Sequence, residues 1–483
     1  MKVFAAIAHG LADLGHTEMF GVVGDGCVYV IDSFQRDCGG HYVAAANEGG
    51  AVLMAQGWAR VSGKVGVAAV THGPGLTNTI TALVEGVKAG TSMVLLAGDT
   101  PAIDPEHAQN VDQPALVAAT GAGFQPLRGP QTVAEDLSRA FYRAQSEHRP
   151  IVFNVPVEFQ WQDVDYQKPY LRFPETRGVI PTSADMDDAI GIVASAHLPV
   201  VIAGRGASAP EAEAAVLRFA RRIEAPVATS VRGKGLFADD PFNLGISGTV
   251  ASEVAVDVLS RSDCLIVFGA SLNKYTSGHR AFTNGKRIVQ INPLASEIGR
   301  CTPVTVGLVG DPGLTADAMV KWLDEAGIPG SGARGQDLQD RLQAQREQAR
   351  SHLVHATPAG TVDLYELAFA LELALPEDRV FLTGSGRFMF AFWSTISVRN
   401  PNAFVDCNGL SSIGLGLATS IGAARAAGDR PTLLVAGDGG FLLSGLSELS
   451  TAVAEQLDLV IIVANDSSYG AEHIALRGHD LDP

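Results

Sequence analysis

The 483-residue sequence has few cysteines, little charge and no long apolar run, and each of these shortages excludes a class of protein. The cysteines are odd in number and contain no C-x-x-C pair, which excludes a disulfide scaffold and a zinc ribbon; they are Cys27, Cys38, Cys264, Cys301 and Cys407. Charged residues make up only 18% and hydrophobic residues 46%, so a disordered chain is not expected. No stretch approaches the roughly 18 apolar residues that a membrane helix needs, and no membrane partner is predicted.

Positive charge is also scarce. Lys and Arg number 35 against 52 Asp and Glu, a formal charge of −17, which argues against nucleic acid as a partner. The N-terminus is not typical of a signal peptide, because His9 and Asp13 interrupt the apolar residues that recur at helical spacing there. We therefore expect a surface helix at the N-terminus and a cytoplasmic protein.

Glycine is the one residue in clear excess, at 53 of 483. Glycines follow apolar runs, as in GVVGDG, LLAGD, VIAGRGA and LLVAGDGG, which is where strands lead into loops in α/β folds. Short β-branched runs alternate with Ala-rich helical stretches along the whole chain, and this pattern predicts parallel sheets covered by helices on both faces. Ligand sites are then expected at the carboxyl ends of the strands.

The chain divides into three blocks, residues 1–165, 184–330 and 358–483, in line with its length. Strands are expected at residues 20–23, 41–45, 65–70, 93–97 and 151–155, then at 199–203, 227–230, 264–268 and 287–291, and finally at 380–383, 432–436 and 457–463. Residues 163–183 are typical of a linker, and residues 334–353 of a polar, solvated connecting helix. The third block is expected to be incomplete at its C-terminus.

The segment from Thr432 to Gly470 carries the most informative motif. It predicts a strand ending at Gly437-Asp438-Gly439, a helix over residues 442–456, and a second strand ending at Asn465-Asp466. Successive parallel strands joined by a right-handed crossover lie close in a sheet, so Asp438 and Asn465 are expected side by side. With the backbone carbonyl of Ser467 they make half of the oxygen shell that Mg²⁺ prefers, and the glycines let a diphosphate approach the backbone. Gly-Asp-Gly alone is a common turn, but together with Asn-Asp it indicates a joint site for a metal and a diphosphate.

With this arrangement the chain resembles thiamine diphosphate enzymes of the acetolactate synthase and pyruvate decarboxylase superfamily. The resemblance spans nearly the whole chain. It implies an α/β protein of three domains, pyrimidine-binding, middle and diphosphate-binding, each a mostly parallel sheet flanked by helices. It also implies that Asp438, Asn465 and Ser467 hold Mg²⁺, and that the cofactor site includes Gly437, Gly439, Gly440 and Tyr469.

Glu48 in ANEGGAVLMAQG matches the glutamate that the family places at the start of a helix. A carboxyl group bonded to the aminopyrimidine ring favours the imino tautomer, whose nitrogen can take the proton from thiazolium C2, and burial suits a carboxyl to share a proton. The alternative is that Glu48 only complements a helix dipole.

In NGLSSIGLG, Ile413 matches the apolar residue that supports the bent cofactor, and Ser411 would offer its carbonyl to the pyrimidine amine. Ile413 could equally be ordinary core.

Four more residues are expected near the reactive carbon. Asp25 matches the Gly-Asp of pyruvate decarboxylase-like enzymes and could act as an acid, or only form a turn. His72 replaces a small hydroxyl residue in a Gly-Pro-Gly loop and could shuttle protons, or only bond the backbone. Gln109 and His107 lie in the segment that carries an active-site Gln in acetolactate synthases and paired His in decarboxylases.

The sequence therefore predicts a homodimer or homotetramer that uses thiamine diphosphate and Mg²⁺ to decarboxylate or join small 2-oxo acids or aldehydes. The cofactor would lie between the Glu48 side of one subunit and the Asp438 side of another. The alternatives are an FAD-containing acetolactate synthase and a non-catalytic thiamine diphosphate- or nucleotide-binding protein. The segment LVAATGAGFQPL lacks the basic residue of acetolactate synthases, and the middle block shows no G-x-G-x-x-G fingerprint, so FAD is not favoured.

Overall fold

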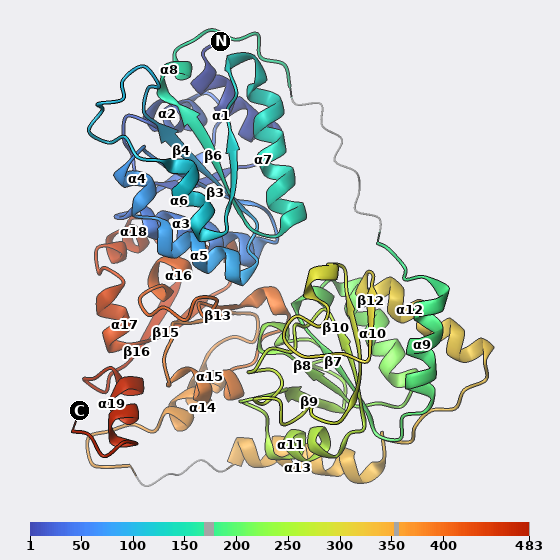
Figure 1. Cartoon of the computed structure of the whole chain (residues 1–483). Coiled ribbons are helices and arrows are strands. Elements are labelled where there is room, and N and C mark those ends of the chain that lie inside the picture. Colours follow the sequence, from blue (N-terminus) through green and yellow to red (C-terminus); the bar gives the residue numbers. More distant parts are fainter. Residues whose placement is uncertain (169–177, 352–356, 483) are drawn as a thin grey trace. The chain divides into compact units, whose positions relative to one another are not determined.

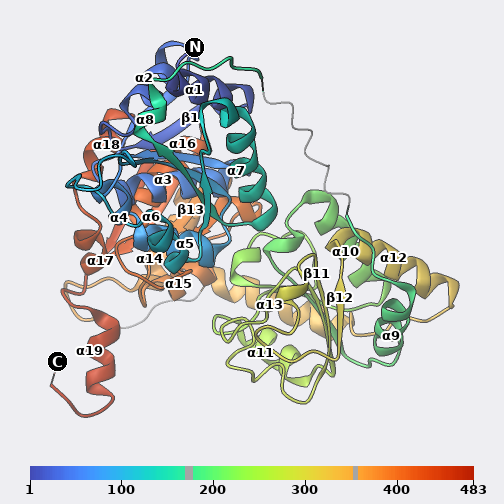
Figure 2. The same cartoon turned by 45° about the horizontal axis from the view of Figure 1, so that its top comes forward.

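The structure, a computed structural model, describes residues 1–168, 178–351 and 357–482. It contains three mostly parallel sheets flanked by helices (Figures 1 and 2), as expected. The chain forms two compact units, one of residues 1–173, 378–389 and 405–483 and the other of residues 174–377 and 390–404. The first and third sheets therefore belong to one unit.

The first sheet has six strands in the order β2-β1-β3-β4-β6-β5. The strands are β1 (Glu18–Gly21), β2 (His41–Ala44), β3 (Gly66–Val70), β4 (Met93–Asp99), β5 (Gly123–Pro126) and β6 (Pro150–Pro156). Successive residues of a strand point to opposite faces, and each face is buried. One face packs on α1 (Val3–Asp13), α2 (Val28–Arg36) and α7 (Val133–Glu147), and the other on α3 (Glu48–Ser62), α5 (Ile80–Ala89) and α6 (Gln113–Thr120).

The second sheet also has six strands, in the order β12-β11-β10-β7-β8-β9. They are β7 (Pro199–Ala203), β8 (Val227–Thr229), β9 (Asn243–Ile246), β10 (Cys264–Phe268), β11 (Arg287–Asn292) and β12 (Val306–Val309). One face packs on α9 (Ser183–Ala194), α10 (Pro210–Arg222) and α12 (Pro312–Glu325), and the other on α11 (Glu253–Arg261) and α13 (Gln336–Ser351). The polar helix expected over residues 334–353 is α13, but it is not fully solvated, because Leu338 and Leu342 are buried against this sheet.

The third sheet has the order β14-β13-β15-β16. Its strands are β13 (Val380–Thr383), β14 (Phe404–Asp406), β15 (Thr432–Gly437) and β16 (Leu459–Ala464), and α16 (Gly416–Ala427) packs on it. The expected helix over residues 442–456 is wrong. Two short helices, α17 (Asp438–Leu443) and α18 (Glu448–Ala454), stand in its place, because Gly445 between them adopts a φ of 78° that ends the first helix.

The first and third sheets are joined by α3 and α16, which lie side by side (Figures 1 and 2). The close approach depends on glycine. A Cβ at Gly57 would stand 2.0 Å from the Thr419 carbonyl oxygen, and a Cβ at Gly422 would stand 1.8 Å from the Met54 carbonyl oxygen. Two glycines thus let the backbones of these helices touch.

All five cysteines are free thiols in the structure. Burial raises the pKa of Cys27 to about 11 and that of Cys264 to about 12. None of the helices in the described part of the chain is long and apolar enough to cross a membrane.

Candidate active site

Glu48 is the first residue of α3. The preceding Asn47 caps the helix, its Oδ1 accepting a hydrogen bond from Gly49 N at 2.8 Å. The Glu48 carboxylate is half-buried, and its Oε2 accepts a hydrogen bond of 2.9 Å from Asn78 Nδ2. Asn78 ends the short helix α4 (Pro74–Thr77), which belongs to the Gly-Pro-Gly segment. The helix start and this segment together fix Glu48.

Asp25 and His72 lie together at the carboxyl edge of the first sheet. Asp25 Oδ1 is 3.3 Å from His72 Nε2 and accepts hydrogen bonds of 3.0 Å from Thr71 Oγ1 and Gly26 N. Partial burial alone would raise the pKa of Asp25, but the Thr71 bond, the nearby His72 and the Gly26 bond outweigh it and hold the pKa below its usual value. Asp25 is thus favoured in its ionised form.

His72 is 1% exposed, and its Nδ1 is buried without a hydrogen-bond partner. Its ring meets that of His107 edge to face, with centroids 5.2 Å apart. His107 Nδ1 accepts a hydrogen bond of 3.2 Å from Gln109 N, and Gln109 O would lie 2.4 Å from a Cβ at Gly73. The four residues expected near the reactive carbon therefore form one cluster within the first sheet's domain.

The second group of candidate residues lies at the carboxyl edge of the third sheet. β15 and β16 are parallel neighbours, with Gly437 opposite Ala464, so Asp438 and Asn465 leave the sheet from adjacent positions. Asp438 begins α17, and Asn465 Oδ1 accepts a hydrogen bond of 2.9 Å from Ser467 N. Ser467 Oγ also lies 3.4 Å from Asn465 Oδ1, and if this hydroxyl turns its proton away, the second lone pair of the amide oxygen can face a cation.

The backbone at two serines is unusual. Ser467 has a φ of 55° and Ser411 a φ of 60°, a left-handed conformation that residues other than glycine rarely adopt and that is concentrated at functional sites. These are the two residues whose carbonyl groups the sequence assigns to the metal and to the pyrimidine amine.

Ile413 lies beside the start of α17. Its Cβ would be 3.6 Å from a Cβ placed on Gly440, and Tyr469 Cε1 would be 2.7 Å from a Cβ placed on Gly439. These glycines have no side chains, so backbone N–H groups stay accessible between Ile413 and Tyr469. Such a cradle suits a diphosphate at a helix start.

The donor set fits a hard cation, because a carboxylate, an amide oxygen and a backbone carbonyl are all oxygen ligands. No cluster of three or more His, Cys, Asp or Glu that could hold a metal occurs in the described ranges.

Two groups of candidate residues thus exist in one chain. No hydrogen bond or ion pair between described residues joins Glu48 or Asp25 to Asp438 or Asn465. The sequence did not reveal the supporting side chains Thr71, Asn78, Glu85 and Glu448, since a lone polar residue on a helix or loop has no pattern to mark it.

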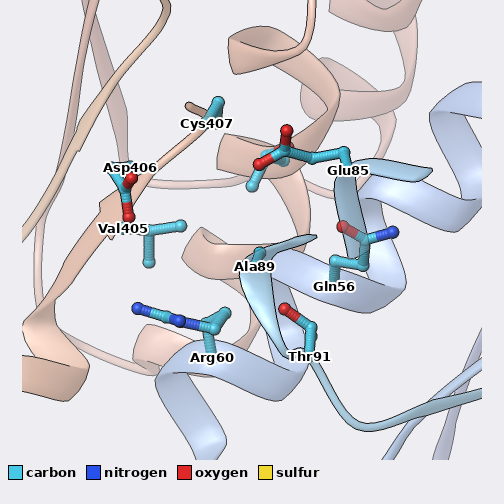
Figure 3. Close-up of a pocket in the computed structure, with 9 residues that line it drawn as sticks. Gln56, Arg60, Glu85, Ala89, Thr91, Val405, Asp406 and Cys407 are labelled. Atoms are coloured by element: carbon cyan, nitrogen blue, oxygen red, sulfur yellow. The ribbon is translucent and has the colours of Figure 1, made fainter. Parts of the chain in front are cut away.

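A small cavity of about 10 Å³ lies where α3 and α5 meet the third sheet (Figure 3), at the lower limit for one water molecule. Its lining contains none of the predicted site residues and consists of Gln56, Arg60, Glu85, Ala89, Thr91, Val405, Asp406, Cys407 and Thr419. Glu85, one of these lining residues, is 3% exposed. Its two carboxylate oxygens accept hydrogen bonds from Gly409 N at 2.9 Å and Leu410 N at 2.6 Å. Glu85 thus holds the segment that leads to Ser411, while the cavity itself is too small for a substrate.

Three family models match the chain, and they describe the domains of thiamine pyrophosphate enzymes. The N-terminal TPP binding domain matches residues 1–117, the central domain residues 186–319, and the C-terminal TPP binding domain residues 384–477. Each match falls on a different one of the three sheets, and the central match spans all the strands of the second sheet.

Several curated proteins are similar over nearly the whole chain. A sulfoacetaldehyde acetyltransferase of Castellaniella defragrans is 28% identical, covering 95% of this chain and 80% of the relative. A probable 2-ketoarginine decarboxylase of Pseudomonas aeruginosa is 29% identical, covering 99% and 84%. A probable acetolactate synthase large subunit of Methanococcus aeolicus is 27% identical, covering 89% and 74%.

Proposed function

The chain belongs to the thiamine pyrophosphate (thiamine diphosphate) enzyme family, and on that premise we propose that it uses this cofactor with Mg²⁺ to decarboxylate, or to join, small 2-oxo acids or aldehydes. The observation that carries the proposal is the register of β15 and β16, which brings Asp438 and Asn465 to adjacent positions. The left-handed backbone at Ser467 adds support. A decarboxylase or carboligase is the activity class of the family to which the chain belongs.

The proposed roles follow from chemistry at each group. When bound, the cofactor would supply a nucleophilic carbon and an acceptor for the electron pair that departing carbon dioxide leaves behind. Glu48 would hold a proton at the pyrimidine ring nitrogen, and Asn78 would keep its carboxylate in place through the bond of 2.9 Å. Ser411 would accept from the pyrimidine amine, and Ile413 would support the bend of the cofactor.

Asp438, Asn465 and the Ser467 carbonyl would hold Mg²⁺. The diphosphate would be surrounded by Gly437, Gly439, Gly440 and Tyr469. The Tyr469 ring lies close to the backbone of Gly439, since a Cβ there would collide with it. The hard oxygen donors of this set supply the shell that Mg²⁺ shares with phosphate oxygens and water.

Asp25 and His72 would move the proton on the substrate side. Asp25 Oδ1 lies 3.3 Å from His72 Nε2. The other ring nitrogen of His72, Nδ1, is buried and has no hydrogen-bond partner, so it offers a second atom through which a proton can pass. His107 and Gln109 would line the same side. No lysine or arginine occurs between Lys88 and Arg128, so this segment supplies no cation to orient a substrate anion.

A substrate panel tests the proposal. The protein, loaded with thiamine diphosphate and Mg²⁺, is given pyruvate, longer 2-oxo acids, 2-ketoarginine and sulfoacetaldehyde, and carbon dioxide and coupled products are measured. Glu48→Gln is expected to retain the cofactor and to lose turnover by about 10²–10⁴-fold, the usual share of a general acid or base. The C2 proton exchange of the bound cofactor, followed by NMR, should fall with it.

Three results would contradict parts of this reading. Turnover unchanged in Glu48→Gln removes Glu48 from the mechanism. Cofactor binding without turnover on any substrate points to a non-catalytic binding protein. An FAD absorption band together with acetolactate formation from pyruvate identifies an FAD-containing acetolactate synthase.

Self-association is part of the proposal. Apolar side chains on α17, α18 and beyond β16 are exposed, with Leu442 at 64%, Leu443 at 61%, Val453 at 75% and Tyr469 at 56%. Exposed apolar residues gathered next to a predicted ligand site are typical of an interface. We therefore place the cofactor between Glu48 of one subunit and Asp438 of another, in a homodimer or homotetramer.

A further inference from the structure

Glu448, the first residue of α18, reaches from the third sheet's domain to the start of α3. Its side chain is buried, with 1% exposure. Its Oε2 accepts a hydrogen bond of 3.2 Å from Ala46 N, and its Oε1 accepts one of 3.1 Å from Asn47 N. These are the two backbone N–H groups directly before Glu48.

The local structure is shaped around this carboxylate. A Cβ at Gly50 would stand 2.1 Å from Glu448 Oε1, so the missing side chain of Gly50 makes room for it. Thr451, one turn later in α18, has its hydroxyl oxygen 2.9 Å from Ala44 O and 3.3 Å from Glu448 Oε2, and its single proton is shared between these two acceptors. Together these contacts fix the backbone of residues 44–47 on both its donor and acceptor sides.

The donors that Glu448 contacts are backbone and hydroxyl groups. Within the described residues no lysine, arginine or histidine forms an ion pair with Glu448. Burial raises the pKa of Glu448, and the two backbone bonds and the Thr451 bond offset this only in part. A buried carboxylate without a cation costs free energy, but an apolar side chain here would leave the Ala46 and Asn47 N–H groups without this acceptor.

We propose that Glu448 is a positioning residue for Glu48: by holding the Ala46 and Asn47 N–H groups, it sets where α3 begins and thus where the Glu48 carboxylate stands. This inference rests on the proposed function, in which Glu48 contacts the pyrimidine ring. Glu448 also connects the α17–α18 segment to the start of α3 in the same chain. That segment begins with Asp438, the proposed metal ligand.

Glu448→Gln tests the proposal in the full-length protein loaded with thiamine diphosphate and Mg²⁺. Glutamine keeps the shape but offers one acceptor for two N–H groups, and its own NH₂ faces the other. We expect the C2 proton exchange and kcat to fall by about 10–100-fold, the effect of a displacement near 1 Å, while cofactor affinity measured by calorimetry stays within about threefold. Amide hydrogen exchange in peptides covering residues 44–50 should rise. The melting temperature should change by no more than about 2–4 °C, equivalent to one modest interaction.

Glu18→Gln is the matched control. Glu18 crosses between the same two sheets, where it forms an ion pair with Arg425 at 3.0 Å, but it touches no candidate site segment. It should leave C2 exchange unchanged. Thr451→Val, which removes the bond to Ala44 O, should lower C2 exchange in the same direction as Glu448→Gln.

The outcomes separate this inference from the function on which it rests. If Glu48→Gln abolishes C2 exchange and Glu448→Gln does not change it, the positioning role is wrong. The role is equally wrong if Glu448→Gln lowers cofactor affinity, stability and exchange together, since that is general unfolding. If Glu48→Gln itself leaves C2 exchange intact, the proposed function fails first.

Discussion

His16 shows how burial alone changes the chemistry of one side chain. Its ring stacks on Phe141 with centroids 4.3 Å apart, and burial, helped by the nearby Lys64, lowers its pKa to about 4. A histidine with a pKa near 6.5 in the unfolded chain then binds fewer protons in the folded state than in the unfolded state between these pH values. The stability that neutral His16 contributes is therefore fully present above pH 6.5 and is lost as the pH falls through about 4.

This gives a pH prediction. The free energy of unfolding of the wild type should fall more steeply between pH 7 and pH 4.5 than that of His16→Gln, by about 1–3 kcal/mol. Urea denaturation at the two pH values measures the difference. His479→Gln, which changes an exposed histidine, is the control and should follow the wild type. Equal slopes for wild type and His16→Gln would contradict the prediction.

Two carboxyl groups show the opposite effects of their surroundings. At Asp25 hydrogen bonds and His72 outweigh partial burial and lower the pKa, whereas at Glu448 burial outweighs the hydrogen bonds and raises it. The exposed acid is thus favoured as an anion, and the buried one keeps a higher affinity for a proton. Environments that push the pKa values of similar groups apart are how one fold separates acid and base roles.

At the scale of elements, strands that show in the sequence as apolar runs were predictable, even where they are short. All twelve strands expected from apolar runs occur in the structure, with ends shifted by a few residues. The sequence did not predict β5, β9, β12 or β14, and the first three of these include Gly123, Pro126, Gly245 and Gly307. Glycine and proline are rare in strands, so these segments do not stand out in the sequence as strands. Pairing with a neighbouring strand is what makes them extended.

The pairing of α3 with α16 gives an element-scale prediction. In Gly57→Ala the new methyl group would meet the Thr419 carbonyl oxygen at 2.0 Å, so the helices must separate and the protein should lose at least about 1–3 kcal/mol of stability. Gly191→Ala is the matched control, because Gly191 lies in α9 with nothing within 4 Å of its would-be Cβ. That variant should be neutral or more stable by up to about 1 kcal/mol. Thermal denaturation compares the two, and similar losses in both would show that helix contact is not the cause.

At the scale of the whole molecule, the sequence predicted candidate site residues but not the side chains that hold their backbone in place. Gly-Asp-Gly and Asn-Asp stand out because each ends an apolar strand, and the parallel neighbours β15 and β16 then place them together. Glu448 has no such mark. Its role appears only when the fold brings it to Ala46 and Asn47, about 400 positions away in the sequence.

A mixing experiment tests whether subunits share the site. Glu48→Gln and Asp438→Asn should each be inactive alone. If each site combines Glu48 of one subunit with Asp438 of another, a mixed dimer has one site with both natural residues. Mixing the two variants under conditions of subunit exchange should therefore restore about a quarter of wild-type activity. No recovery despite exchange, shown by mass spectrometry of mixed dimers, would place both residues of each site in one chain.

The obstacle at position 57 is a carbonyl oxygen of the main chain, not the side chain of Thr419. Shortening a neighbouring side chain therefore cannot make room for a larger residue there. In a genetic screen starting from a bulky replacement at this position, second-site suppressors within α16 should be missing, and recovery of function should come through true revertants. A side-chain substitution in α16 is therefore not expected to compensate for the loss of Gly57.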